Sequence, residues 1–119
     1  MSETKNYSGC CHCGQVHFDV STTLEPVISC NCSICTKRGA LWTFVKPEQF
    51  ALRSGEDALV QYLFNKKVIR HLFCDTCGVE AFARGTALDG SEMVAINVRC
   101  LEGVDMSALS PTPFNGRAL

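Results

Sequence analysis

Cysteine spacing constrains this chain more than any other feature of its sequence. Seven of the nine cysteines lie in three clusters with C-x-C or C-x-x-C spacing: Cys11 and Cys13; Cys30, Cys32 and Cys35; Cys74 and Cys77. Residues 1–6 lack the basic and then apolar pattern of a signal peptide, so we expect a cytoplasmic protein with reduced thiols. Clustered cysteines in a reducing compartment indicate metal binding rather than a disulfide scaffold.

The central cluster predicts one short loop that directs three sulfurs to a common point. A C-x-C step in extended chain places Cys30 and Cys32 on the same face, and the C-x-x-C step to Cys35 suits a tight turn around a metal. Zinc prefers four ligands in a tetrahedron, so these three thiolates leave one position unfilled. This open position favours a catalytic zinc. The alternative is a second structural zinc whose fourth ligand is another side chain of the protein.

The outer clusters predict a closed site that joins the two halves of the chain. Cys11 and Cys13 with Cys74 and Cys77 would supply four thiolates, and zinc affinity at such a site adds on the order of 10 kcal/mol to folding. Spacing alone leaves another pairing open, in which Cys30 and Cys32 join Cys74 and Cys77. The sequence therefore predicts at least one zinc, and two zincs under the first pairing.

Length and charge exclude several classes of protein. A chain of 119 residues fits one domain, which we expect to cover residues 1–119. The formal net charge is −1, and no basic run is present, so we expect no nucleic-acid partner. No apolar stretch approaches the ~18 residues of a membrane span, so we expect no membrane partner. These patterns do not determine the oligomeric state.

Short runs of alternating and β-branched residues predict an all-β domain of short strands joined by turns. We expect strands over residues 16–20, 27–29, 41–45, 79–84 and 93–98. Residues 59–64 and 68–73 flank a polar tripeptide, 65–67, and predict a hairpin. Single helical turns are expected at 47–50 and 107–109, and the tail from Leu101 is expected to lie over the surface. No stretch shows sustained helical periodicity.

Other residues near the clusters have ordinary structural interpretations. We expect Cys10 and Cys100 to be small buried apolar residues, because they fall outside the clusters. His71 is expected to be a strand histidine with a satisfied hydrogen bond, although it is the one histidine that could cap the central zinc. Trp42 and Phe44 are expected in the core rather than in a substrate wall.

The arrangement of motifs resembles a known family. The runs are Tyr7-x-Gly9-x-Cys11-His12-Cys13-Gly14-x-Val16-x-Phe18, then Cys30-x-Cys32-x-x-Cys35 with Gly39, then Phe73-Cys74-x-x-Cys77-Gly78, and finally Asn97-Val98-Arg99-Cys100-Leu101. Together they cover nearly the whole chain. They resemble the glutathione-dependent formaldehyde-activating enzymes, and the centromere protein V group is similar in sequence.

The resemblance implies a tent-like all-β fold with several short antiparallel sheets. It also implies two zinc sites: a structural one at Cys11, Cys13, Cys74 and Cys77, and a catalytic one at Cys30, Cys32 and Cys35. The implied activity is that of a carbon–sulfur lyase. Such an enzyme joins glutathione, as substrate, to formaldehyde or a related small aldehyde, or cleaves the adduct.

The chemistry of the central cluster is consistent with a thiol substrate. A zinc ion with three thiolates carries one net negative charge and is a weaker Lewis acid than a histidine-ligated zinc. Sites such as the histidine-ligated zinc of carbonic anhydrase lower the pKa of bound water to about 7. A thiol loses its proton on metal coordination even when the metal is a weaker Lewis acid. Lys37 and Arg38 follow the cluster directly and are candidates to bind the carboxylates of a glutathione-like thiol.

Two alternatives from other classes remain at this point. One is a non-catalytic zinc module that binds a protein partner, which the near-neutral charge allows. The other is a thiol or metal sensor, in which the open position binds a ligand and reports it. Metal analysis combined with a glutathione titration would separate both from an enzyme.

Overall fold

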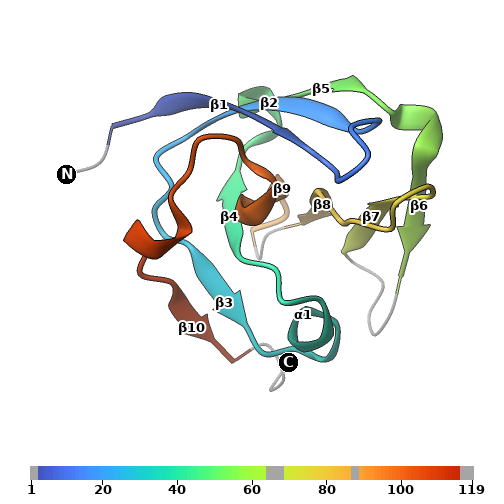
Figure 1. The fold of residues 1–119 in the computed structure, drawn as a ribbon. Coiled ribbons are helices and arrows are strands. Elements are labelled where there is room, and N and C mark those ends of the chain that lie inside the picture. Colours follow the sequence, from blue (N-terminus) through green and yellow to red (C-terminus); the bar gives the residue numbers. More distant parts are fainter. Residues whose placement is uncertain (1–2, 64–68, 87–88, 116–119) are drawn as a thin grey trace.

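The computed structural model describes residues 3–63, 69–86 and 89–115 and shows a β protein with one short α-helix, α1 (Ser33–Arg38) (Figure 1). The strands are β1 (Lys5–Cys10), β2 (His17–Thr22), β3 (Ile28–Cys30), β4 (Trp42–Val45), β5 (Phe50–Ser54), β6 (Leu59–Tyr62), β7 (Arg70–Cys74), β8 (Phe82–Thr86), β9 (Glu92–Asn97) and β10 (Thr112–Phe114). Single 3-10 turns cover Pro47–Gln49, Glu56–Ala58, Val98–Cys100 and Met106–Ala108. The prediction of an all-β fold is confirmed.

The strands form two sheets. The smaller is antiparallel with the order β1-β2-β5, and the larger has the order β10-β3-β4-β9-β8-β7-β6. All pairs in the larger sheet are antiparallel except β10 with β3, which is parallel. The expected antiparallel sheets are present except at this edge, where β10 runs in the same direction as β3.

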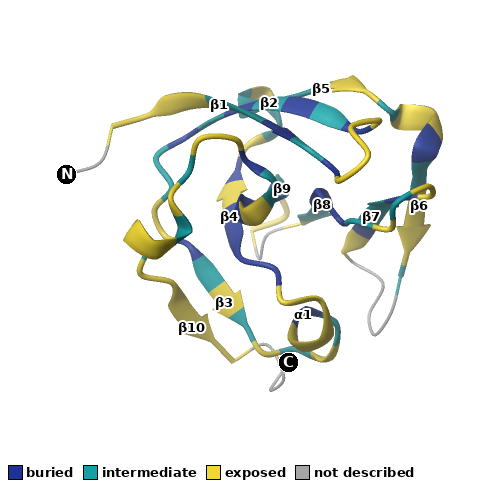
Figure 2. Ribbon diagram, in the orientation of Figure 1, coloured by how far each residue is buried: buried dark blue, intermediate teal, exposed yellow. Residues whose placement is uncertain are grey.

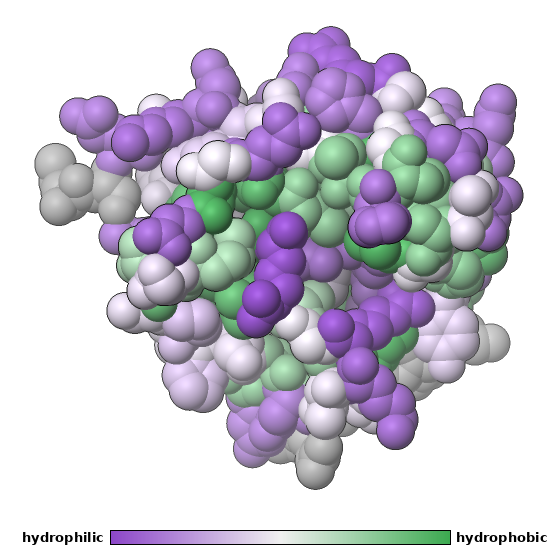
Figure 3. Space-filling model, in the orientation of Figure 1, coloured by the Kyte–Doolittle hydropathy of each residue, from purple (hydrophilic) through white to green (hydrophobic). Residues whose placement is uncertain are grey.

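The main core lies between the two sheets. Phe18 of β2, Phe50 of β5 and Phe82 of β8 pack together, with ring centroids 4.7 to 6.2 Å apart. The Phe18 ring rests on the backbone of Gly9, where any β-carbon would overlap with it. Burial of each such ring contributes about 1.5–3 kcal/mol. Figure 2 shows the buried residues along the inner strands, and Figure 3 shows hydrophilic residues above a band of hydrophobic ones on the same side.

Most of the expected elements are present. Strands over 16–20, 27–29, 41–45 and 93–98 correspond to β2, β3, β4 and β9, and the hairpin corresponds to the antiparallel pair β6 and β7. Its expected turn, 65–67, lies outside the described residues. The strand expected over 79–84 begins only at Phe82, because the Val79 carbonyl accepts the N–H of Cys74 and so closes the turn after β7. The helical turns expected near 47–50 and 107–109 are 3-10 turns.

Some elements were not expected. No local pattern predicted β1, β5 or β10, and the central loop folds as α1 instead of a turn alone. Phe44 was expected in the core, but it is 46% exposed on β4, because its face of the sheet is covered by α1 only in part. With six residues, α1 is far shorter than a bilayer span, and no helix in the described ranges combines the length and apolar character that a span needs.

Candidate metal centres

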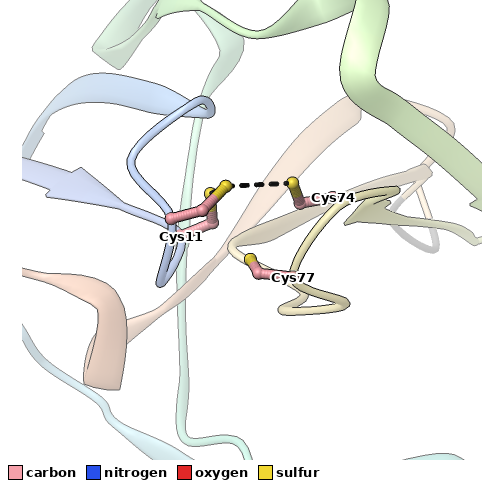
Figure 4. Close-up of side chains that lie close together, drawn as sticks. Cys11, Cys74 and Cys77 are labelled. Atoms are coloured by element: carbon pink, nitrogen blue, oxygen red, sulfur yellow. Dashed lines mark hydrogen bonds between the residues drawn. The ribbon is translucent and has the colours of Figure 1, made fainter.

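The outer cysteine clusters converge on one point. Cys11 and Cys13 lie in the loop after β1, Cys74 ends β7, and Cys77 lies in the turn that follows. The sulfur of Cys13 lies 3.6 Å from those of Cys11 and Cys74, and all four sulfurs lie within 4.8 Å of one another. Sulfurs about 2.3 Å from a tetrahedral zinc are about 3.8 Å apart, which is close to the two distances of 3.6 Å, so the four sulfurs could hold this metal. Figure 4 shows Cys11, Cys74 and Cys77 turned toward the shared centre.

Backbone hydrogen bonds hold both loops in this arrangement. In the first loop, the Cys11 N–H donates to the Val16 carbonyl at 3.0 Å, and the Val16 N–H donates to the Cys11 sulfur at 3.4 Å. In the second, the Gly78 N–H donates to the Cys74 carbonyl at 2.8 Å. Gly78 has a φ of 80°, which favours glycine, so the turn can close around the sulfurs.

The thiols of this cluster differ in acidity. Burial raises the pKa of Cys11 to about 11, and the neighbouring thiols add to this effect. Burial also acts to raise the pKa of Cys77, but hydrogen bonds from the backbone at Cys13 and Val79 outweigh it and lower that pKa to about 6. Metal binding must therefore displace protons from some members of the cluster, and metal affinity will rise with pH.

The central cluster is a second, incomplete set of ligands. Cys30 ends β3, Cys32 is the N-cap of α1, and Cys35 lies in the first turn of that helix. Their three sulfurs lie within 4.8 Å of one another. Among the described residues, no histidine, cysteine or carboxylate joins them as a fourth ligand. The donor set fits a thiophilic metal with one remaining position.

The helix and a tryptophan set the environment of these sulfurs. Burial raises the pKa of Cys35, which is the most enclosed of the three, and the Trp42 indole N–H opposes this by donating to the Cys35 sulfur at 3.3 Å. Partial burial likewise acts to raise the pKa of Cys32, but hydrogen bonding to Cys35 and Cys30 lowers that pKa overall. Gly39, with a φ of 67°, ends α1 in the left-handed conformation, so that the chain can turn into β4.

Lys37 and Arg38 lie in the last turn of α1, beyond Cys35. Lys37 is exposed. Arg38 Nη1 lies 2.5 Å from Glu80 Oε1, and the guanidinium stacks over the Phe73 ring at 5.4 Å from its centroid. A guanidinium has five N–H donors, so Arg38 retains donors beyond the contact with Glu80.

Glu80 is the residue that sequence reasoning missed. Its side chain is 2% exposed, and its second oxygen lies 2.7 Å from His71 Nδ1. The Asn97 side-chain N–H donates to the Glu80 carbonyl at 2.9 Å. A single acidic residue between Val79 and Ala81 was the available signal. The expectation that His71 is a satisfied strand histidine is confirmed.

The remaining cysteines differ from expectation. Cys10, the last residue of β1, and Cys100, in the 3-10 turn after β9, are partly exposed rather than buried. Burial nevertheless raises the pKa of Cys100 to about 12, with a contribution from Cys10. Neither belongs to a cluster of possible metal ligands among the described residues. Trp42 is buried, as expected.

Comparison with known proteins shows the family to which this chain belongs. A family model of the glutathione-dependent formaldehyde-activating enzymes matches residues 6–113. A crystal structure of a Rhodobacter sphaeroides protein, a structural genomics target, is similar with a TM-score of 0.78 and 30% sequence identity. That match covers 89% of this chain and 97% of the other chain. The chain therefore belongs to the glutathione-dependent formaldehyde-activating enzyme family.

Proposed function

We propose that the protein is a zinc-dependent carbon–sulfur lyase that forms or cleaves the adduct of glutathione, or a related thiol, with formaldehyde or another small aldehyde. The observation that carries this proposal is the three-cysteine cluster, for which the described residues supply no fourth ligand. When bound there, zinc would lower the pKa of a substrate thiol, so that the thiol proton passes to water and the sulfur remains nucleophilic. We place this activity in the cytoplasm, where glutathione-type thiols are reduced.

The chain contributes position and charge to this reaction. Cys30, Cys32 and Cys35 hold the metal, and the four-cysteine cluster joins the loops after β1 and β7. Lys37 and Arg38 attract substrate carboxylates, and Glu80 fixes the direction of the Arg38 guanidinium. During adduct formation the substrate sulfur bonds to the carbonyl carbon, and the carbonyl electron pair moves to oxygen, which takes a proton from water. Cleavage is the reverse.

The test is NMR exchange spectroscopy on S-hydroxymethylglutathione. The uncatalysed exchange is fast, so its rate is measured without enzyme and subtracted. The zinc-loaded wild type should accelerate exchange, and Cys32→Ser should abolish the acceleration and lose the zinc of one site. Cys10→Ser is the matched control, because it removes a thiol that belongs to neither cluster, and it should retain activity. Full activity in Cys32→Ser with half the zinc would refute the proposal. Two zincs that neither exchange nor respond to thiols would indicate a structural module instead.

A further inference from the structure

One face of the larger sheet is apolar and partly exposed. Paired residues in a sheet lie on the same face, so the register places Cys30, Trp42 and Phe44 on the side that α1 covers. Four of the large apolar side chains with more than a third of their surface exposed lie in strands, and all four are on this face: Phe44, Val60, Tyr62 and Phe114. No described strand residue on this face is Asp, Glu, Lys or Arg.

One of these aromatic rings lies beside the three-cysteine cluster. Phe114 of β10 is the register partner of Cys30, and its carbonyl accepts the Asn31 N–H at 3.1 Å. Asn31 also donates its side-chain N–H to Asn115 Oδ1 at 3.0 Å, so the end of β10 is fixed beside the cluster.

Phe44 lies farther from the cluster, because the antiparallel pairing of Ile28 with Trp42 places Cys30 and Phe44 on opposite sides of that pair along the strands. It follows Trp42 by two residues on β4, and it pairs with Ala95, which packs against the small core of Cys35, Ala40 and Trp42. Phe44 and Phe114 are 46% and 47% exposed. Formaldehyde has no hydrocarbon group that such rings could cover. Phe114 is therefore the exposed aromatic ring placed to contact such a group in a larger substrate.

We infer that Phe114 is a specificity residue that contacts the hydrocarbon part of the substrate, so that the enzyme handles thiol adducts of aldehydes carrying an aliphatic or aromatic group. This inference rests on the proposed function. The bond chemistry is unchanged: sulfur bonds to the carbonyl carbon, and the oxygen gains a proton. Phe114 lies one residue beyond the part that the family model matches.

The experiment compares glutathione adducts of formaldehyde, butanal and benzaldehyde with wild type, Phe114→Ser and Phe114→Leu. Tyr62→Ser is the matched control, because Tyr62 is 46% exposed on the same face but lies on β6, at the opposite edge of the sheet. Phe114→Ser should lower kcat/KM for the benzaldehyde adduct by about five- to tenfold, as expected for a half-exposed apolar contact. The formaldehyde adduct should change less than about twofold, Phe114→Leu should recover part of the loss, and Tyr62→Ser should have no effect.

Binding provides a readout that does not depend on turnover. The chain has one tryptophan, Trp42, whose indole N–H reaches Cys35, so its fluorescence should report occupancy of this site. The affinity for S-benzylglutathione should fall in Phe114→Ser by the same factor as kcat/KM.

Equal effects of Phe114→Ser on all adducts, or none on any, would overturn the inference. The same holds if Phe114→Ser changes the sedimentation coefficient without changing aldehyde preference, since the face would then be a contact between copies of the chain. A wild type that accelerates no adduct would refute the proposed function itself. Acceleration of the formaldehyde adduct with no difference between variants would remove this inference alone.

Discussion

The hydrogen bond from Trp42 to Cys35 offers a quantitative test of the three-cysteine centre. Trp42→Phe keeps an aromatic ring in the buried position and removes the indole N–H that lies 3.3 Å from the sulfur. A hydrogen bond to a charged group contributes about 1.5–3 kcal/mol. Loss of a partner of a metal ligand weakens metal binding by about 10- to 100-fold, which agrees with that energy. We expect a loss of this size for the metal at Cys30, Cys32 and Cys35.

The assay is chelator competition with cobalt, whose thiolate charge-transfer absorption reports each site. Trp42→Phe should weaken one of two cobalt-binding steps and leave the step at the four-cysteine site unchanged. Phe82→Leu is the control for packing loss, because Phe82 is fully buried in the main core and not in the small core around Cys35. It should lower thermal stability while both metal affinities stay the same. Cobalt affinities in Trp42→Phe within about twofold of wild type would refute the role of the indole N–H.

Three further predictions follow from the structure. Cys77→Ser should remove one ligand of the four-cysteine site and abolish most of the contribution of metal binding there to folding, which is on the order of 10 kcal/mol. Calorimetry with and without a chelator measures this contribution, and a melting temperature equal to that of wild type would contradict the prediction. Glu80→Gln leaves Arg38 and His71 without a buried carboxylate and should lower the free energy of unfolding, measured in urea, by about 2 kcal/mol. This loss is smaller than that expected for a fully buried ion pair, because the Arg38 side chain is 28% exposed. Hydrogen bonds from Arg53 and Ser8 lower the pKa of Asp19. The stabilisation by Asp19 is therefore present above its unfolded-state pKa and is lost as pH falls through its folded-state pKa. Asp19→Asn should flatten the dependence of stability on pH at acid pH, and an unchanged dependence would contradict this.

Cysteine spacing predicted the metal-binding clusters because a short chain segment can present its sulfurs to one point in few ways. The grouping of Cys11 and Cys13 with Cys74 and Cys77 needed long-range structure, since spacing alone also allowed Cys30 and Cys32 as partners. The structure brings together the sulfurs of the first grouping. Cys30 and Cys32 instead lie with Cys35 in a separate cluster.

Helix α1 was missed because six residues are too few to show a helical period, although Gly39 is a typical residue just beyond a helix end. Strand β10 has only exposed residues, so its strand state depends on β3 and not on an alternating pattern of its own. The exposure of Phe44 depends on how much of the sheet α1 covers, and no local pattern contains that information.

The most direct measurement is X-ray absorption at the selenium edge of zinc-loaded protein with the selenol analogue of glutathione, under anaerobic conditions. A free coordination position at Cys30, Cys32 and Cys35 predicts zinc as a direct neighbour of selenium in the wild type and in Cys10→Ser, and its absence in Cys32→Ser. Selenium without a zinc neighbour in fully loaded wild type would show that the position is closed to substrate thiols, and the proposed chemistry would be wrong.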